Sequence, residues 1–418
     1  MYEIIKIEGF CVLLNHLSNT KTCKVEAMVG GGFINETKSN SGIAHFTEHV
    51  ISESWKKCFK KGCAKFWSKY GAHYNAETGD NYVAYYIEGF INDINLMIDY
   101  ICKIIVEPDI PTRRLEKEKK AVINELSGYT QVEVDLYNKS NELVFKNEGL
   151  RYYSDRKLQI KNLKKFNKHS VEKWIRQNYC QDNIIFIISG NFDKKRIIKK
   201  MATIFKKKEM NIFSPPEPLD IFNTGKAIAF VPAPRKKNMS IQLLFPYKFD
   251  QPNMNIIYTS FFQMFVNGSI QSIIMYELRE KMELIYTSDV DINVYTSSAL
   301  MTITLSSKSG NFKVVLKEAK RVLKKISEGD FSDENLENLK KQFIINHYIM
   351  HKSNDFYTRF YGTQLMNKLD SLNKNTKIYT PEEVVVFIKN ISKKDFVKFI
   401  NHVLNFDNLK IVYQAPKK

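Results

Sequence analysis

A faint internal repeat constrains the fold of this 418-residue chain more than any other feature. The segment LEKEKK at residues 115–120 parallels the segment LENLKK at residues 336–341, which lies 221 positions later. Each segment follows an amphipathic, helix-like run, at residues 91–106 and 312–326, and a short turn. A repeat of this kind predicts two halves with related structures.

A proline-rich segment separates the two halves. Three prolines at residues 215, 216 and 218 exclude regular helix and sheet and predict an exposed linker. The chain is also long enough for two or three domains rather than one. We therefore expect an N-terminal domain at residues 1–213, a linker at 214–218 and a homologous C-terminal domain at 219–418.

Short β-rich runs alternate with longer helical patterns in both halves. Residues 82–88 and 183–190 are expected to form strands, and residues 299–305 and 409–413 are their expected counterparts. Such strands, separated by helices of differing length, predict an α+β fold. In it, each half is an antiparallel sheet with helices packed on one face.

The segment HFTEH contains the residues most closely tied to chemistry. His45, Glu48 and His49 lie three and four positions apart in an expected helix, which places their side chains on one face. Two neutral imidazoles there can bind zinc, while the carboxylate between them accepts a proton from a metal-bound water. The alternative is a solvated helix that carries two histidines without a metal.

A second helical segment supplies a candidate third ligand. Glu125 lies 76 positions beyond His49, and Glu118 lies seven positions before Glu125. Seven residues are nearly two helical turns, so both carboxylates share a face. One could bind metal while the other orients a ligand. The alternative is an ordinary charged helix, because Glu and Lys are good helix formers.

The two segments together resemble the pitrilysin family of zinc metallopeptidases, the inverted zincins. Two-domain bacterial peptidases, insulin-degrading enzyme and mitochondrial processing peptidase, with its beta subunit, are relatives in that family. The resemblance implies one zinc ion per chain, held by His45, His49 and Glu125. It also implies catalytic roles for Glu48 as general base and for Glu118 as the residue that orients a ligand. By the same resemblance, the two halves would face each other across a closed chamber.

Two further segments resemble substrate-binding elements of the family. Residues 71–78 are similar to its substrate-binding strand, which implies that Asn75 and Ala76 lie beside a bound peptide. Arg279 and Tyr286 match an Arg and a Tyr seven positions apart that reach the substrate near the zinc. The resemblance implies that both bind substrate and act in catalysis, with the Tyr hydroxyl donating to the oxyanion. The alternative is a surface arginine and a core tyrosine.

The second half lacks a metal site at the repeated positions. At the offset of 221, Glu118 corresponds to Leu339 and Glu125 to Asn346, and no histidine lies near residues 266–270. One active site per chain is therefore expected. Residues 149–156 and 268–272 depart from the family pattern, which favours a specialised peptidase, such as one that matures a secreted peptide.

Charge and composition restrict the other function classes. A net charge of +18 could indicate nucleic-acid binding, but the basic runs are spread along expected helices, as on solvated helix faces. No apolar run approaches the roughly 20 residues that span a bilayer, so no membrane insertion is expected. Residues 1–6 lack the pattern of a signal peptide. The six cysteines form no C-x-x-C pair and are expected to be free thiols, so we expect a cytoplasmic protein.

These observations predict a zinc-dependent endopeptidase that cleaves peptides or short unfolded segments. Its expected partners are a peptide substrate and either a second copy or a homologous subunit, in a homodimer or heterodimer. No nucleic-acid partner is expected. The alternative is a catalytically weak or silent partner subunit of a hetero-oligomeric peptidase, although the complete set of candidate residues argues against silence.

Overall fold

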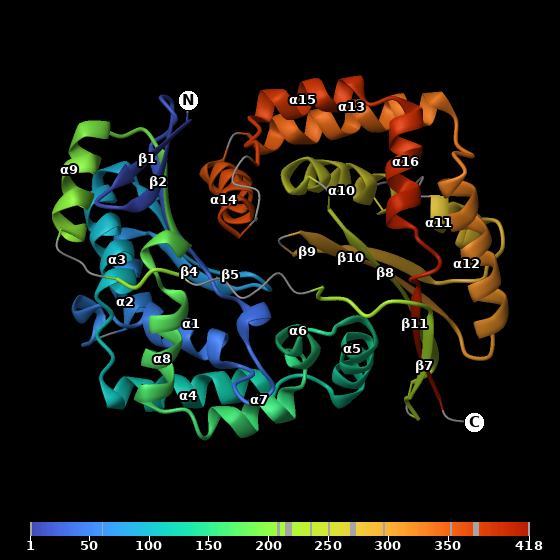
Figure 1. The fold of residues 1–418 in the computed structure, drawn as a ribbon, viewed down its shortest axis with the longest axis horizontal. Coiled ribbons are helices and arrows are strands. Elements are labelled where there is room, and N and C mark those ends of the chain that lie inside the picture. The colour runs from blue at the N-terminus through green and yellow to red at the C-terminus, as the bar shows by residue number, and fades with distance from the viewer. Residues whose placement is uncertain are drawn as a thin grey trace. The chain divides into compact units, whose positions relative to one another are not determined.

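The chain folds into two compact units in a computed structural model (Figure 1). The first unit comprises Met1–Tyr129, Glu148–Leu219 and His351–Asn375, and the second comprises Thr130–Asn147, Asp220–Met350 and Thr376–Lys418. The structure describes residues 2–60, 62–206, 210–213, 220–234, 236–249, 251–267, 273–295, 297–351, 353–370 and 376–416.

The first unit is built on a six-stranded sheet with the order β1-β2-β6-β3-β5-β4. Neighbouring strands are antiparallel except for β2 and β6, which run parallel. Every residue of β6 is buried, as expected for an apolar run in the middle of a sheet. The strands are β1 (Tyr2–Ile7), β2 (Phe10–His16), β3 (Thr22–Gly30), β4 (His73–Thr78), β5 (Tyr82–Phe90) and β6 (Ile184–Gly190).

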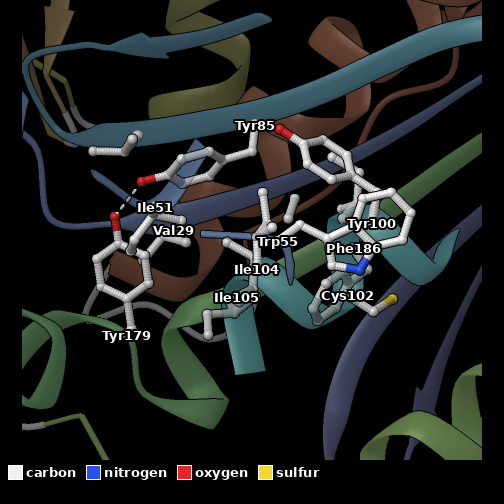
Figure 2. Packing of buried hydrophobic residues seen from close by; sticks show 14 of the residues in the cluster. Val29, Ile51, Trp55, Tyr85, Tyr100, Cys102, Ile104, Ile105, Tyr179 and Phe186 are labelled. Carbon is white, nitrogen blue, oxygen red and sulfur yellow. Dashed lines mark hydrogen bonds between the residues drawn. The ribbon is translucent and has the colours of Figure 1, made fainter. Parts of the chain in front are cut away.

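The hydrophobic core of the first unit lies between one face of this sheet and helices α1 and α3. Figure 2 shows part of it, where the hydroxyls of Tyr85 and Tyr179 are 2.6 Å apart and hydrogen bonded. The helical segments of this unit are η1 (Phe33–Asn35), α1 (Ile43–Ser52), η2 (Lys56–Cys58), α2 (Cys63–Trp67), η3 (Ser68–Tyr70), η4 (Ile91–Asp93), α3 (Ile94–Val106), α4 (Thr112–Leu126), α6 (Glu148–Tyr152), α7 (Arg156–Leu163), α8 (Lys168–Asn178), η5 (Gln181–Asn183), α9 (Lys194–Phe205) and α14 (Asn354–Asp370).

The second unit contains a five-stranded sheet with the order β7-β11-β8-β10-β9. Its strands are β7 (Ala227–Pro232), β8 (Asn238–Lys248), β9 (Thr287–Tyr295), β10 (Ser298–Lys308) and β11 (Lys410–Ala415). Its helical segments are α5 (Gln131–Val144), α10 (Pro252–Asn267), α11 (Ile273–Met275), η6 (Tyr276–Glu280), α12 (Phe312–Ser327), α13 (Asp333–Met350), α15 (Pro381–Asn390) and α16 (Lys393–Val403).

The two sheets share one topology. The order β2-β6-β3-β5-β4 in the first unit is repeated by β7-β11-β8-β10-β9 in the second. The one parallel pair of each sheet also falls at the same place, between β2 and β6 and between β7 and β11. The predicted α+β fold with two related halves is confirmed, but the sheets are not purely antiparallel and their helices are not confined to one face. The four strands expected from the sequence are β5, β6, β10 and β11, and the two amphipathic runs are α3 and α12.

The two units exchange one helix each. Helix α5 belongs to the second unit and packs against β7, β8 and β11, whereas α14 belongs to the first and packs against β3 and β6. The units therefore differ from the continuous segments 1–213 and 219–418. Each exchanged helix covers the face of its sheet that lies opposite the other helices. On this face of the first sheet, Lys24 of β3 forms an ion pair with Asp355 of α14. The expected linker at 214–218 lies outside the described residues.

The structure corrects the expectation that all six cysteines are free thiols. Cys58 and Cys63 form a disulfide, with their Cα atoms 4.8 Å apart, whereas Cys11, Cys23, Cys102 and Cys180 are free. The sequence did not indicate this bond because Cys58 and Cys63 are separated by four residues and do not form a C-x-x-C pair. Among the described residues, no helix is both long and apolar enough to cross a membrane.

Candidate active site

Helix α1 carries His45, Glu48 and His49 on a rigid support. Its apolar residues, including Phe46 and Ile51, are buried in the core, so the helix cannot rotate freely. The buried side chain of Glu36 caps its N-terminus. Oε2 of Glu36 accepts a hydrogen bond of 2.9 Å from the backbone N–H of Gly42, and Oε1 accepts one of 2.8 Å from that of Ala44. These bonds satisfy N–H groups that lack partners within the helix.

Helix α4 carries the other two candidate carboxylates and packs against α1. Its buried residues Leu115, Glu118, Val122 and Leu126 recur at helical spacing, so Glu118 lies on the packed face. Glu125 is next to this face and is half exposed, with 49 % of its side-chain surface accessible. A difference of seven positions places both carboxylates on one side of the helix, where Glu118 is buried and Glu125 is accessible.

His45, His49 and Glu125 converge in space. Each offers one potential ligand atom, and these atoms all lie within 4.8 Å of one another. His45 Nε2 is 3.8 Å from Glu125 Oε1, and His49 Nε2 is 3.5 Å from Glu125 Oε2. Ligand atoms at about 2.0–2.2 Å from a tetrahedral zinc ion are roughly 3.4 Å apart. The three side chains therefore fit a zinc ion after small adjustments. Because they would supply three ligands to a tetrahedral ion, the fourth coordination position would stay open.

The protonation of the two imidazoles also suits a metal site. Burial, with the charges of His49 and Arg156, lowers the pKa of His45 to about 3, so this ring is neutral at physiological pH. Burial alone would lower the pKa of His49 as well, but its interactions with Glu118, Glu48 and Glu125 raise it. The surrounding carboxylates thus attract positive charge to this position, and a bound cation would satisfy them.

Glu118 faces the ring nitrogen of His49 that points away from Glu125. Its Oε2 lies 3.7 Å from His49 Nδ1, while His49 Nε2 is directed to Glu125. Burial would raise the pKa of Glu118, but His49 and Lys117 lower it overall, so it stays ionised. This is the position from which a carboxylate can orient a metal-binding imidazole.

Glu48 lies beside the cluster with little solvent access. Only 7 % of it is exposed, and its Oε2 accepts a hydrogen bond of 3.1 Å from the hydroxyl of Thr78. Burial raises the pKa of Glu48 to about 7, although His49 and Thr78 act in the opposite direction. A carboxylate with a pKa near neutrality is suited to both accepting and returning a proton. The sequence did not single out Thr78 as a partner of Glu48.

Asn75 and Ala76 lie on β4, which forms one edge of the six-stranded sheet and pairs with β5. Asn75 is exposed, and its Nδ2 donates a hydrogen bond of 3.3 Å to the hydroxyl of Tyr86. Ala76 packs against the core. Thr78 is the last residue of the same strand, so the end of this edge strand lies next to Glu48.

One carboxylate joins the elements that carry the site. Glu53 caps the C-terminus of α1 and forms an ion pair with Arg114 in the first turn of α4. It also accepts hydrogen bonds from the backbone N–H of Cys63, at 3.2 Å, and from the hydroxyl of Tyr74 on β4, at 3.5 Å. Arg114 in turn donates to the carbonyl of Cys58, at 2.9 Å. Neither Glu53 nor Arg114 belongs to a motif, and the sequence offered no signal for them.

Arg279 and Tyr286 belong to the second unit. Arg279 lies in η6, with about half of its side chain exposed and its Nε 3.8 Å from Glu280. Tyr286 directly precedes β9 and is 49 % exposed, so it is not the core tyrosine of the alternative reading. Their participation in the site of the first unit stays a prediction.

The second unit keeps the helix that corresponds to α4 but not its carboxylates. Helix α13 carries Leu339 and Asn346 where α4 carries Glu118 and Glu125. Among the residues that the structure describes, His45, His49 and Glu125 are the one group of three or more potential metal ligands.

Two family profiles match the chain in succession. Residues 11–174 match the profile described as insulinase (peptidase family M16), and residues 165–343 match that of the peptidase M16 inactive domain. An uncharacterized zinc protease of Rickettsia bellii is 22 % identical over 97 % of this chain and 95 % of its own length. The mitochondrial-processing peptidase subunit beta of Saccharomyces cerevisiae is 25 % identical over 52 % of this chain and 48 % of its own.

Solved structures show the same fold at low sequence identity. A protease from Helicobacter pylori superimposes with a TM-score of 0.86 at 15 % identity, and all of both chains is covered. A peptidase M16 inactive domain from Pseudomonas fluorescens superimposes with a TM-score of 0.80 at 14 % identity, covering all of this chain and 98 % of the other. The chain is a member of peptidase family M16, the insulinase or pitrilysin family of zinc metallopeptidases.

Proposed function

We propose that the protein is a zinc-dependent endopeptidase whose active site lies in the first unit. The observation that carries the proposal is the convergence of His45, His49 and Glu125 beside the buried carboxylate of Glu48. Three ligands of this type with an open position are typical of catalytic rather than structural zinc. The complete set also favours an active enzyme over a silent partner subunit.

Zinc, when bound, supplies a Lewis acid that polarises a carbonyl and makes a water molecule acidic near pH 7. Glu48 lies between the two histidines on α1 and accepts the proton of the attacking water. Its burial then favours the return of that proton to the leaving amine, because a carboxyl with a pKa of about 7 is a competent acid as well as a base. Thr78 holds Oε2 of Glu48 in one orientation through its hydroxyl.

Glu118 and the scaffold around it keep the ligands in place. Its carboxylate faces His49 Nδ1 and fixes which nitrogen of that ring is directed to the metal position. Glu36 at the start of α1 and Glu53 at its end hold the helix at both termini. The ligand atoms therefore need little rearrangement when a metal binds.

A substrate would bind in extended form along β4. An edge strand offers unpaired backbone N–H and C=O groups, and a peptide that adds to it gains main-chain hydrogen bonds with little sequence preference. Asn75 and Ala76 would then lie beside the peptide. This mode of binding favours flexible peptides and unfolded segments over folded proteins, because only an extended chain can pair with the strand.

We further assign Arg279 and Tyr286 to substrate binding and oxyanion stabilisation, on their match to the family pattern. Both side chains are about half exposed, as a substrate contact requires. Two departures from the family pattern in the sequence, at residues 149–156 and at residues 268–272, which lie outside the described residues, support a narrow substrate range such as peptide maturation. A dimer, with itself or with a homologous chain, is the proposed assembly.

Incubation of the purified protein with a defined peptide mixture tests the proposal. Mass spectrometry should detect internal cleavage that a chelator abolishes and added zinc restores. The Glu48→Gln variant is the matched control, because it keeps the shape of the side chain and cannot accept the proton. It should retain zinc and lose about 10² to 10⁴-fold in turnover. Turnover within about threefold of wild type would contradict the role of Glu48, and products that persist in chelator would contradict zinc catalysis.

A further inference from the structure

Arg156 in the first turn of α7 is a partly buried cation whose guanidinium is fixed from one side. Its Nη1 donates hydrogen bonds to the carbonyl of Tyr153, at 3.2 Å, and to Oε1 of Gln159, at 2.9 Å. The guanidinium carbon lies 4.4 Å from the centre of the Tyr129 ring. In the described part of the chain, Arg156 forms no ion pair with a carboxylate, and its Nε and Nη2 have no hydrogen-bond acceptor.

These contacts place Arg156 at the junction of the two ligand helices. Gln159 is buried and lies against Gly42, the residue before α1, where an added Cβ would be 3.4 Å from the Cβ of Gln159. His45 follows Gly42 by three positions, which is nearly one helical turn. Tyr129 follows Glu125 by four positions and lies just beyond the end of α4, against which α7 packs.

The pair formed by Arg156 and Tyr129 is accessible from solvent. The ring of Tyr129 is 51 % exposed, and a ligand can therefore reach the pair from solvent. Among the described residues, the first unit thus holds a cation without an anionic partner, close to the start of the helix that carries His45 and His49.

We propose that Arg156, supported by Tyr129, binds a carboxylate group of the peptide substrate. The proposal rests on the proposed peptidase function and names a substrate class, peptides with a carboxylate close to the scissile bond. That carboxylate is either an Asp or Glu side chain or the C-terminus of a short peptide. The net charge of +18 adds a long-range attraction for acidic peptides.

The geometry suits a carboxylate better than other groups. A guanidinium presents its free N–H donors in a planar fork that matches two carboxylate oxygens. The two bonds from Nη1 and the stacking on Tyr129 fix the orientation of this plane before a ligand arrives, which reduces the entropy lost on binding. Hydrogen bonds to a charged partner change affinity by on the order of 10 to 100-fold.

The alternative is that Arg156 only holds α7 in place. An Arg156→Gln variant separates the two roles when it is measured on matched peptides. Four versions of one cleaved peptide are needed: Glu or Gln beside the scissile bond, each with a free or an amidated C-terminus. Arg156→Lys keeps the charge without the fork, and Arg196→Gln, at an exposed position on α9, controls for the general loss of one positive charge.

Two readouts should be taken, kcat/KM on the zinc-loaded enzyme and the peptide Kd on the zinc-loaded Glu48→Gln protein. Arg156→Gln should lower the preference for the carboxylate-bearing peptide by about 10 to 100-fold in both, with an intermediate loss in Arg156→Lys and none in Arg196→Gln. Zinc content and values for the neutral, amidated peptide should stay within about threefold.

The results distinguish the subsite from the function on which it rests. If Arg156→Gln weakens kcat/KM and Kd only for the peptides with Glu, the subsite binds a side-chain carboxylate. If it weakens them only for the peptides with a free C-terminus, the subsite binds the C-terminal carboxylate. A lower Kd for the carboxylate-bearing peptides, without hydrolysis of any of the four, would support the subsite and refute the proposed peptidase function. The proposal would be overturned if Arg156→Gln weakened kcat/KM and Kd equally for all four peptides. It would also be overturned if the variant kept the wild-type preference for carboxylate-bearing peptides in the Kd.

Discussion

The hydroxyl of Thr78 donates a hydrogen bond of 3.1 Å to Oε2 of Glu48, which joins the end of the edge strand β4 to the carboxylate between the two ligand histidines. The strand that we propose to bind substrate and the group that we propose to move the proton are therefore in direct contact. A peptide that displaces β4 would also displace the partner of Glu48.

Replacement of Thr78 with valine should shift the pH dependence of catalysis. The hydroxyl stabilises the ionised form of Glu48, so its loss should raise the pKa of this carboxyl. Activity that requires ionised Glu48 is lost as pH falls through that pKa, and the acidic limb of the kcat profile should move to higher pH. Thr78→Ser, which keeps the hydroxyl, is the control. An acidic limb at the wild-type position in Thr78→Val would contradict the contact.

Removal of a zinc ligand should abolish metal binding. We expect His49→Ala, His45→Ala and Glu125→Gln each to lose a bond to the ion, because these atoms form the cluster within 4.8 Å. Elemental analysis after dialysis against a weak chelator measures the effect, with His347→Ala in the second unit as the control. Full zinc occupancy in His49→Ala would exclude the assignment.

The ion pair between Glu53 and Arg114 should set the spacing between α1 and α4. Both side chains are largely buried, with 14 % and 16 % exposed, so Arg114→Met leaves a carboxylate without its cation. We expect a loss of about 1–3 kcal/mol in the free energy of unfolding of the metal-free protein. The zinc Kd should rise in addition, because Glu125 is on the displaced helix.

A double variant tests whether these two side chains act as a pair. Glu53→Gln combined with Arg114→Met should cost less than the sum of the two single losses, since the second change removes a group that is already unpaired. Urea denaturation of the metal-free proteins and a zinc titration provide the two measurements. Additive losses would show that Glu53 and Arg114 act independently.

The contact between Lys24 of β3 and Asp355 of α14 should make stability depend on pH. Burial would raise the pKa of Asp355, but the hydrogen bond and charge of Lys24, at 2.7 Å, and the charge of Arg359 lower it overall. A carboxyl with a lowered pKa in the folded state stabilises the fold above its unfolded pKa of about 3.9, and this contribution disappears as pH falls through the folded value.

The Asp355→Asn variant should therefore be less stable than wild type at pH 6 and lose less stability on acidification below pH of about 4. Denaturant unfolding at a series of pH values measures both effects in the metal-free protein. Parallel curves for the two proteins over this range would show that the pair contributes nothing to the docking of α14 on its sheet.

Substitution of Tyr286 with phenylalanine tests the assignment of the second unit to the reaction. Only a hydroxyl is lost, so zinc content and fold should stay unchanged. If the hydroxyl stabilises the oxyanion, kcat should fall by on the order of 10² to 10³-fold, less if Arg279 provides a second donor. Tyr413→Phe in β11 is a matched control. An unchanged kcat would leave Tyr286 as an exposed tyrosine without a role in chemistry.

The sequence determined the elements and the residues within each of them. His45, Glu48 and His49 share a face of α1, and Glu118 and Glu125 share a face of α4, because helical geometry sets the relation between residues a few positions apart. The strands at β5, β6, β10 and β11 follow from local apolar runs in the same way. The repeat at an offset of 221 indicated two related halves, since both copies encode the same order of elements.

Only the tertiary structure decided which distant residues meet. The contacts of Glu36 with α1, of Thr78 with Glu48, and of Glu53 with Arg114 join segments whose separation in the sequence carries no periodic signal. The exchange of α5 and α14 was hidden for the same reason. Such contacts depend on how whole elements pack, and packing is set by the combined burial of many side chains rather than by the spacing of a few.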